Sequence, residues 1–170
     1  PPGGPRPGGA IGLPCACMVV LAAAWEACGA WAAAGAAAAL VDAAGPEPVV
    51  MDLPGSGHQI TDPAREELAH ALRMSPISMG NRISAARGLV RHPLLVALVD
   101  SAAISAWAAR LVVLEVADLS AELAAEVTDE VCRRVRDRLR SGRRPWTSAE
   151  VGRAARMMRR RLCPDSDETA

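Results

Sequence analysis

Arginine carries the most concentrated chemistry in this sequence. All 19 Lys or Arg positions are Arg, and twelve of them lie between Arg133 and Arg161 with only two acids, Asp137 and Glu150. Guanidinium groups bind phosphate through charge and paired hydrogen bonds. Such a cluster would attract a nucleic-acid backbone in a salt-dependent way. The alternative is a pair of solvated helix faces, partly neutralised by the acidic half of the first helix.

Three arginines within this cluster recur at helical spacing. Arg153, Arg156 and Arg160 should share one face of the last helix, so we expect them to contact phosphate. The formal net charge of the chain is zero, which implies no partner through overall charge. The arginine cluster therefore predicts double-stranded DNA as a partner through local and not overall charge.

The residue types that usually carry catalysis or bind metals are scattered. His58, His70 and His92 have no Cys or acidic partner in a recognised pattern, and Cys15 and Cys17 are too close for a usual zinc knuckle. The absence of Lys excludes the usual P-loop and a lysine Schiff base. We predict no catalytic, cofactor-binding or metal residue here, no small-molecule substrate, and a reduced cytoplasmic protein.

Residues 62–91 are predicted to form a helix-turn-helix-like unit. Pro76 disfavours helical geometry at Ser75, so the first helix should end just before it. Ser75 can then cap a second helix, with Pro76 at its first position. The apolar face of that helix falls at helical spacing, on Met79, Ile83, Ala86 and Val90.

The second helix of this unit could read DNA. Asn81 lies on the face away from the apolar stripe, Arg82 and Arg87 flank that face, and Asn and Arg are suited to base and phosphate contacts. Gly80 and Gly88 can read nothing on that face, and many purely structural helical hairpins share the same pattern.

The N-terminal part of the chain is apolar. Residues 1–14 are rich in Pro and Gly and are expected to be a disordered lead-in. Residues 15–41 are long enough to span a bilayer, but Ala and Gly dominate and Glu26 lies near the middle. We predict instead a soluble helix that Trp25 and Trp31 anchor to the core, with no membrane contact. Because the chain begins at Pro1, we expect a fragment or a misplaced start.

Further helices follow the second helix of the unit. Residues 45–57 should be a loop, and 94–99 a short apolar helix. Trp107, Leu111 and Leu114 define the next helix, expected to be the buried centre of the domain. Ser120 caps a long helix whose stripe is Leu123, Val127, Val131, Val135 and Leu139. Thr147 to Glu150 form a capping box that begins the last helix. The fold class is therefore all-α, a multi-helix domain over 15–163, with an acidic tail at 164–170.

The order of these motifs resembles a known family. The matching segments are Ala24-Trp25-Glu26, Ala30 to Ala34, Ala71 to Ser75, Asn81-Arg82-Ile83, Ala86-Arg87, His92-Pro93, Ile104 to Arg110, Glu115, Asp118-Leu119, Thr147 to Arg161 and Cys163-Pro164-Asp165. Together they resemble the helical domain of unknown function (family 222) that precedes an HNH nuclease module in actinobacterial 13E12-repeat proteins. The resemblance covers roughly residues 18–167.

The resemblance implies a DNA-associating module of an HNH endonuclease. The metal-dependent chemistry of that family would belong to a nuclease module downstream, so no catalytic residue can be assigned here. We expect this segment alone not to be an enzyme, whereas its full-length relatives would be. The alternative is a structural or protein-interaction domain without nucleic-acid binding, and self-association is a further expectation.

Overall fold

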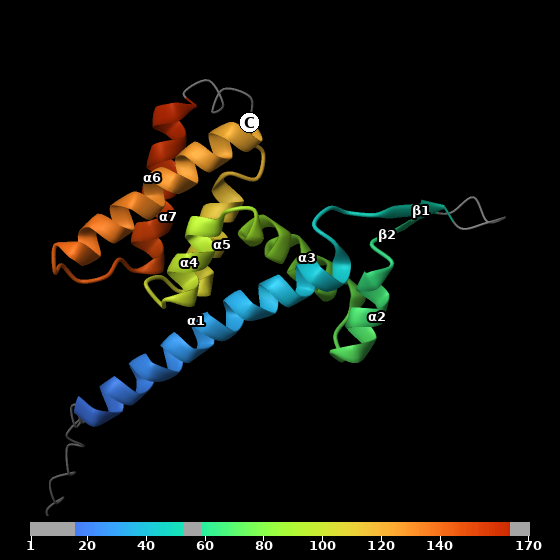
Figure 1. The fold of residues 1–170 in the computed structure, drawn as a ribbon, viewed down its shortest axis with the longest axis horizontal. Helices are drawn as coiled ribbons and strands as arrows, with labels where there is room; N and C mark the ends of the chain where they lie inside the picture. The colour runs from blue at the N-terminus through green and yellow to red at the C-terminus, as the bar shows by residue number, and fades with distance from the viewer. Residues whose placement is uncertain (1–15, 53–58, 164–170) are drawn as a thin grey trace, which may run out of the picture.

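The computed structural model describes residues 16–52 and 59–163, and within them it confirms the all-α class (Figure 1). The seven helices are α1 (Ala16–Ala44), α2 (Ala64–Ala71), α3 (Pro76–Val90), α4 (Pro93–Asp100), α5 (Ala106–Glu115), α6 (Ala121–Arg140) and α7 (Ser148–Leu162). The lead-in at 1–14 and the acidic tail at 164–170 lie outside the described residues.

Predicted helix caps are present as hydrogen bonds. The Ser75 and Ser120 hydroxyls accept from the backbone N–H groups of the third residue into α3 and α6, and Ser105 makes the same bond at the start of α5. Thr147 and Glu150 form the complete capping box of α7. Each cap satisfies an N–H group that a helix end would otherwise leave unpaired, so local sequence sets where these helices begin.

The core lies where α3, α4, α5, α6 and α7 meet. The predicted stripes are buried there, including Met79 and Ile83 of α3, Val127 and Val131 of α6, and Val151 of α7. α5 packs against both α3 and α7, so it lies at the centre as predicted.

The prediction that Trp107 and Leu114 lie on the buried face of α5 is wrong. Ala108, Ala109 and Val112 are buried, whereas Trp107 and Leu114 are each 56% exposed. Small residues allow α5 to lie close to two neighbouring helices at once, and the bulky residues are left on the remaining face.

The expectation that Trp25 and Trp31 anchor the first helix is also wrong. They are 70% and 65% exposed, and the buried residues of α1 begin at Ala30. Figure 1 shows the N-terminal end of α1 extending beyond the other helices. Ala34 and Val41 lie on the packed face of the second half, so α1 is held by small side chains against α3 and α4.

The predicted loop at 45–57 contains part of a two-stranded hairpin. β1 (Val50–Asp52) pairs antiparallel with β2 (Gln59–Thr61), in the register Val50 to Thr61. Asp62 follows β2 with φ +55°. Its backbone N–H donates to the Val49 carbonyl at 2.7 Å, and its Oδ1 accepts from the Val49 N–H at 3.1 Å. Asp62 thus closes the hairpin, and its side chain does not cap α2.

Arg87 connects this hairpin to α1 and α3. Its guanidinium donates to the carbonyl oxygens of Ala44 at 2.7 Å and Gly45 at 2.8 Å, and to both Asp62 carboxylate oxygens at 2.8 and 2.9 Å. Its side chain is only 5% exposed. An arginine at the C-terminal end of α1 satisfies unpaired carbonyls and complements the helix dipole. The prediction that Arg87 flanks an outward face is therefore wrong.

We predict that Arg87→Ala destabilises the fold by roughly 3 kcal/mol, because removing one partner of a buried pair leaves the other uncompensated. Urea unfolding followed by circular dichroism measures the change. The matched control is Arg91→Ala, one turn later on the helix. Arg91 pairs with Glu47 at 2.7 Å, but both side chains are more than half exposed, so the loss should be under about 1 kcal/mol. Equal losses in the two variants would contradict the role given to Arg87.

The same pair predicts a pH dependence. The hydrogen bonds from Arg87 hold the pKa of Asp62 below its ordinary value of 3.8. A carboxyl with a lowered pKa in the folded state adds stability above its unfolded pKa, and that stability is lost as pH falls through the folded pKa. Stability should therefore fall below about pH 4, and Asp62→Asn should show a smaller acid-induced fall. An unchanged acid slope would contradict this account.

Gly88 allows α3 and α5 to approach each other. A Cβ atom at Gly88 would collide with Cγ1 of Val113. Gly88 therefore faces a neighbouring helix, where the sequence had placed it on an outward surface. The absence of a side chain is a packing requirement at this position.

We predict that Gly88→Ala costs roughly 1–3 kcal/mol by overpacking. On a Val113→Ala background the same change should be neutral or stabilising by up to about 1 kcal/mol, because Ala favours helix over Gly. Gly29→Ala is the control, since nothing lies within 4 Å of a Cβ at Gly29. A double-mutant cycle measures the coupling, and additive effects would rule out the Gly88–Val113 contact as the cause.

Candidate nucleic-acid interface

The last helix carries the candidate phosphate-binding arginines on its exposed side. Val151, Ala155 and Met158 bury the opposite face of α7 against α5 and α6. Residues 153 and 160 fall nearly opposite that buried face at 100° per residue. Arg153 and Arg160 are exposed, so the predicted shared face exists.

Two further arginines of α7 pair with the end of α5. Arg156 contacts a Glu115 carboxylate oxygen at 3.1 Å, although its side chain is 60% exposed. Arg159 is only 17% exposed; it pairs with Asp118 at 2.7 Å and donates to the Glu115 carbonyl at 2.8 Å. The hydrogen bonds from the Arg159 guanidinium to the Asp118 carboxylate lower the pKa of Asp118. Arg159 is held in place, whereas Arg156 is partly neutralised yet still reaches solvent.

The arginines of α6 are mostly engaged with acids of the same helix. Arg133 and Arg134 both bond Glu130, each with a 2.8 Å contact. Hydrogen bonds from Arg134, then Arg133, lower the pKa of Glu130. Arg140 lies 3.6 Å from Asp137. Neutralisation by acids of the same helix, the alternative reading of the cluster, therefore holds for much of α6.

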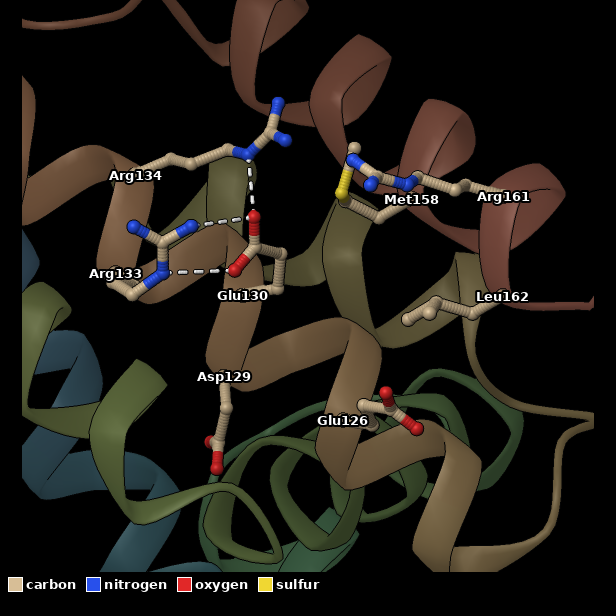
Figure 2. A pocket seen from close by; sticks show the side chains of 8 residues that line it. All are labelled: Glu126, Asp129, Glu130, Arg133, Arg134, Met158, Arg161 and Leu162. Atoms are coloured by element: carbon tan, nitrogen blue, oxygen red, sulfur yellow. Dashed lines mark hydrogen bonds and ion pairs between the residues drawn. The ribbon is translucent and has the colours of Figure 1, made fainter.

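A hollow of about 610 Å³ lies between α6 and α7 (Figure 2). Glu126, Asp129 and Glu130 line its α6 side, while Arg134 and Arg161 lie near its upper edge. Acids and bases are mixed around this hollow, so its charge favours neither anions nor cations.

The connection between α6 and α7 is braced by one carboxylate. Glu150 accepts from Arg144 at 2.7 Å and from the Thr147 backbone N–H at 2.7 Å, which lowers its pKa to about 2. Arg138 donates to the Arg144 carbonyl at 2.7 Å. Glu150 is consequently charged at any physiological pH and sets the direction in which α7 leaves the turn.

The remaining predicted DNA-binding residues lie elsewhere. Asn81 and Arg82 are exposed on the N-terminal part of α3, where Arg82 approaches the Met74 sulfur at 3.1 Å. In Figure 1, α7 lies on the left and α2 on the right of the molecule, with α3 beginning beside α2. The structure therefore divides the predicted residues between two surfaces, and buried Arg87 belongs to neither.

The helices on either side of Ser75 are present, but their use on DNA stays a prediction. α2 ends at Ala71, and Arg73 adopts φ +52° before α3 begins at Pro76. α3 is packed by α1, α2, α4 and α5. In its first two turns Met79 is buried, whereas Ile77, Asn81 and Arg82 are exposed.

No group of three His, Cys, Asp or Glu side chains within the described parts of the chain could hold a metal ion. His70 is exposed, His92 is half-buried with its pKa lowered by burial, and His58 lies outside the described residues. Burial raises the pKa of the Cys132 thiol to about 11, as expected for an inert core cysteine.

Sequence reasoning missed the acids that partner α7. Glu115 and Asp118 lie more than 40 residues from Arg156 and Arg159 along the chain, with separations of 41 to 44. No local spacing signals such pairs. The Glu130–Arg134 pair, in contrast, follows from helical spacing.

No family model, curated protein or solved structure matches this chain. The resemblance to the helical domain of 13E12-repeat proteins therefore stays a prediction.

Proposed function

We propose that this helical domain binds the backbone of duplex DNA without sequence preference, as the N-terminal module of an HNH endonuclease. The observation that carries the proposal is the exposed face of α7, where Arg153 and Arg160 point away from the core and Arg156 borders them. The nuclease centre is not assigned to this segment.

Arg153 and Arg156 differ in their ion pairing from Arg133, Arg134 and Arg159, which acids engage closely. Among the described residues, Arg153 has no carboxylate partner. The exposed Arg156–Glu115 pair contributes little energy, so a phosphate oxygen could replace Glu115 at small cost. The three side chains therefore offer positive charge on one side of a rigid helix that a DNA backbone can approach.

Lack of sequence preference follows from the same geometry. Arginines that contact phosphate position a protein on DNA but do not read bases. Asn81 and Arg82, the residues suited to base contacts, lie on the distant α3 surface. A single docking of α7 on DNA would not bring them to the same groove.

We predict that Arg153→Ala/Arg156→Ala/Arg160→Ala weakens binding to a fluorescein-labelled 20-base-pair duplex. The slope of log K against log salt should fall by about three, close to one per lost phosphate contact. Fluorescence anisotropy between about 50 and 200 mM NaCl measures the slope. The charge-matched control replaces Arg65, Arg73 and Arg91, far from α7, and should keep the wild-type slope. Equal slopes for all three proteins would favour a structural or protein-interaction domain.

We also predict that residues 1–170 alone do not cut DNA. HNH chemistry needs a histidine to activate water and a metal ion to stabilise the leaving oxygen, and the described histidines have no partners arranged for this. Supercoiled plasmid incubated with the protein and Mg²⁺, Mn²⁺ or Ni²⁺ should stay supercoiled. Nicking that is lost in His58→Ala, His70→Ala or His92→Ala would reveal a catalytic site in this segment.

A further inference from the structure

The outer face of α1 carries an unusual arrangement of large and small residues. Met18, Leu21 and Trp25 are 58%, 49% and 70% exposed. The same heptad spacing continues through exposed, smaller residues, namely Cys28, Ala32, Gly35 and Ala39. The face is thus bulky at its N-terminal end and nearly flat at its C-terminal end.

This face points away from the domain. At 100° per residue, Trp25 lies about 140° around the helix from Ala30, where the buried stripe of α1 begins. The domain itself therefore cannot cover the outer face. Between Ala16 and Ala44 the only charged residues are Glu26, which lies off the heptad positions, and Asp42, which takes the heptad position after Ala39 near the C-terminal end of the helix. The outer face is therefore uncharged from Met18 to Ala39.

We propose that two copies of this chain associate through the outer faces of α1, packed antiparallel. In that orientation the bulky half of each helix lies on the flat half of the other. A register that places Trp25 of one copy on Gly35 of the other also places Leu21 on Ala39 and Cys28 on Ala32. Nothing within 4 Å occupies the space beside Gly35, so the Trp25 ring has room there.

The orientation follows from side-chain size. Parallel helices would set Trp25 against Trp25 and Gly35 against Gly35, which separates the helices at one end and leaves a gap at the other. Antiparallel packing alternates large and small residues along the whole contact, as close packing requires. It also keeps the two Glu26 carboxylates apart, each lying opposite the region of Ala34 in the other copy.

The size of the contact predicts a reversible dimer. Residues 18–42 span about 37 Å of helix, and a contact strip about 10–16 Å wide covers roughly 400–600 Å² per copy. This is at the small end of specific interfaces, where complexes dissociate readily.

A bilayer fits the same apolar surface less well. The segment from Cys17 to Ala44 is long and apolar enough to cross a membrane. Within the described part of α1, the segment from Ala16 to Gly29 is free of the domain, and its length of about 21 Å is less than a hydrocarbon core of about 30 Å. A spanning helix would have to withdraw Leu40 and Val41 from the core.

Sedimentation velocity on the 170-residue chain between about 1 and 200 μM tests the proposal in the range where small interfaces dissociate. The wild type should shift from monomer to dimer. Leu21→Gln/Trp25→Gln should raise the dissociation constant at least about tenfold, as expected for central apolar contacts. Trp107→Gln/Leu114→Gln, matched in residue type on α5, should leave it unchanged. Circular dichroism should give the same melting temperature for both variants as monomers.

A size swap tests the orientation. Gly35→Trp should weaken the dimer, because Trp25 of the other copy would meet a second Trp. Adding Trp25→Ala to Gly35→Trp should restore association, because each new Trp then faces an Ala. A monomer at every concentration, an unchanged constant in Leu21→Gln/Trp25→Gln, or no restoration by the swap would overturn the proposal. Co-sedimentation of the wild type with phosphatidylcholine vesicles would overturn it in favour of a lipid surface.

Discussion

The Arg87 guanidinium joins three parts of the chain: the C-terminal end of α1, the residue that follows the hairpin, and α3. It binds the last carbonyls of α1, the carboxylate of Asp62 and, through its own helix, the centre of the bundle. α1 has few large side chains on its packed face. Apolar burial alone therefore contributes little to holding the C-terminal end of α1 in place. A buried cation surrounded by acceptors permits only one arrangement of these groups, because any displacement leaves a charge unpaired in a dry environment.

Asp62 shows how one residue can meet several constraints. Its backbone has φ +55°, which is unfavourable for a residue other than glycine. The hydrogen bonds to Val49 and the pair with Arg87 offset that cost. The hairpin and the C-terminal end of α1 therefore depend on a single side chain. The short hairpin places Asp62 beside the Arg87 guanidinium.

Ion pairs with neighbouring acids determine which arginines can still bind an anion from solution. Acids within α6 and at the end of α5 engage several of them, and the carboxylates of Glu130 and Asp118 have lowered pKa values as a result. The side of α7 away from its neighbours presents Arg153 and Arg160 to solvent. The apolar surface of α1 lies on a different helix, so the proposed DNA contact through α7 and the proposed self-association through α1 use different residues.

The sequence predicted many helix starts and buried helix faces because local interactions determine them. Serine and threonine caps, the capping box of Thr147 and Glu150, and the stripe of α6 act over three or four residues, so their patterns predict helix starts and buried faces directly. The exposed face of Arg153 and Arg160 follows from the same periodicity. A pair such as Glu130–Arg134 is equally local.

Tertiary structure alone decided the roles of Arg87, Gly88 and Trp25. Periodicity places a residue on a face of its helix but does not say what lies against that face. Arg87 is buried because α1 and Asp62 bring acceptors to it, and Gly88 is required because Val113 of α5 approaches there. Trp25 is exposed because no helix reaches the first half of α1. Each outcome depends on a neighbour distant in sequence, and no spacing along the chain records that neighbour.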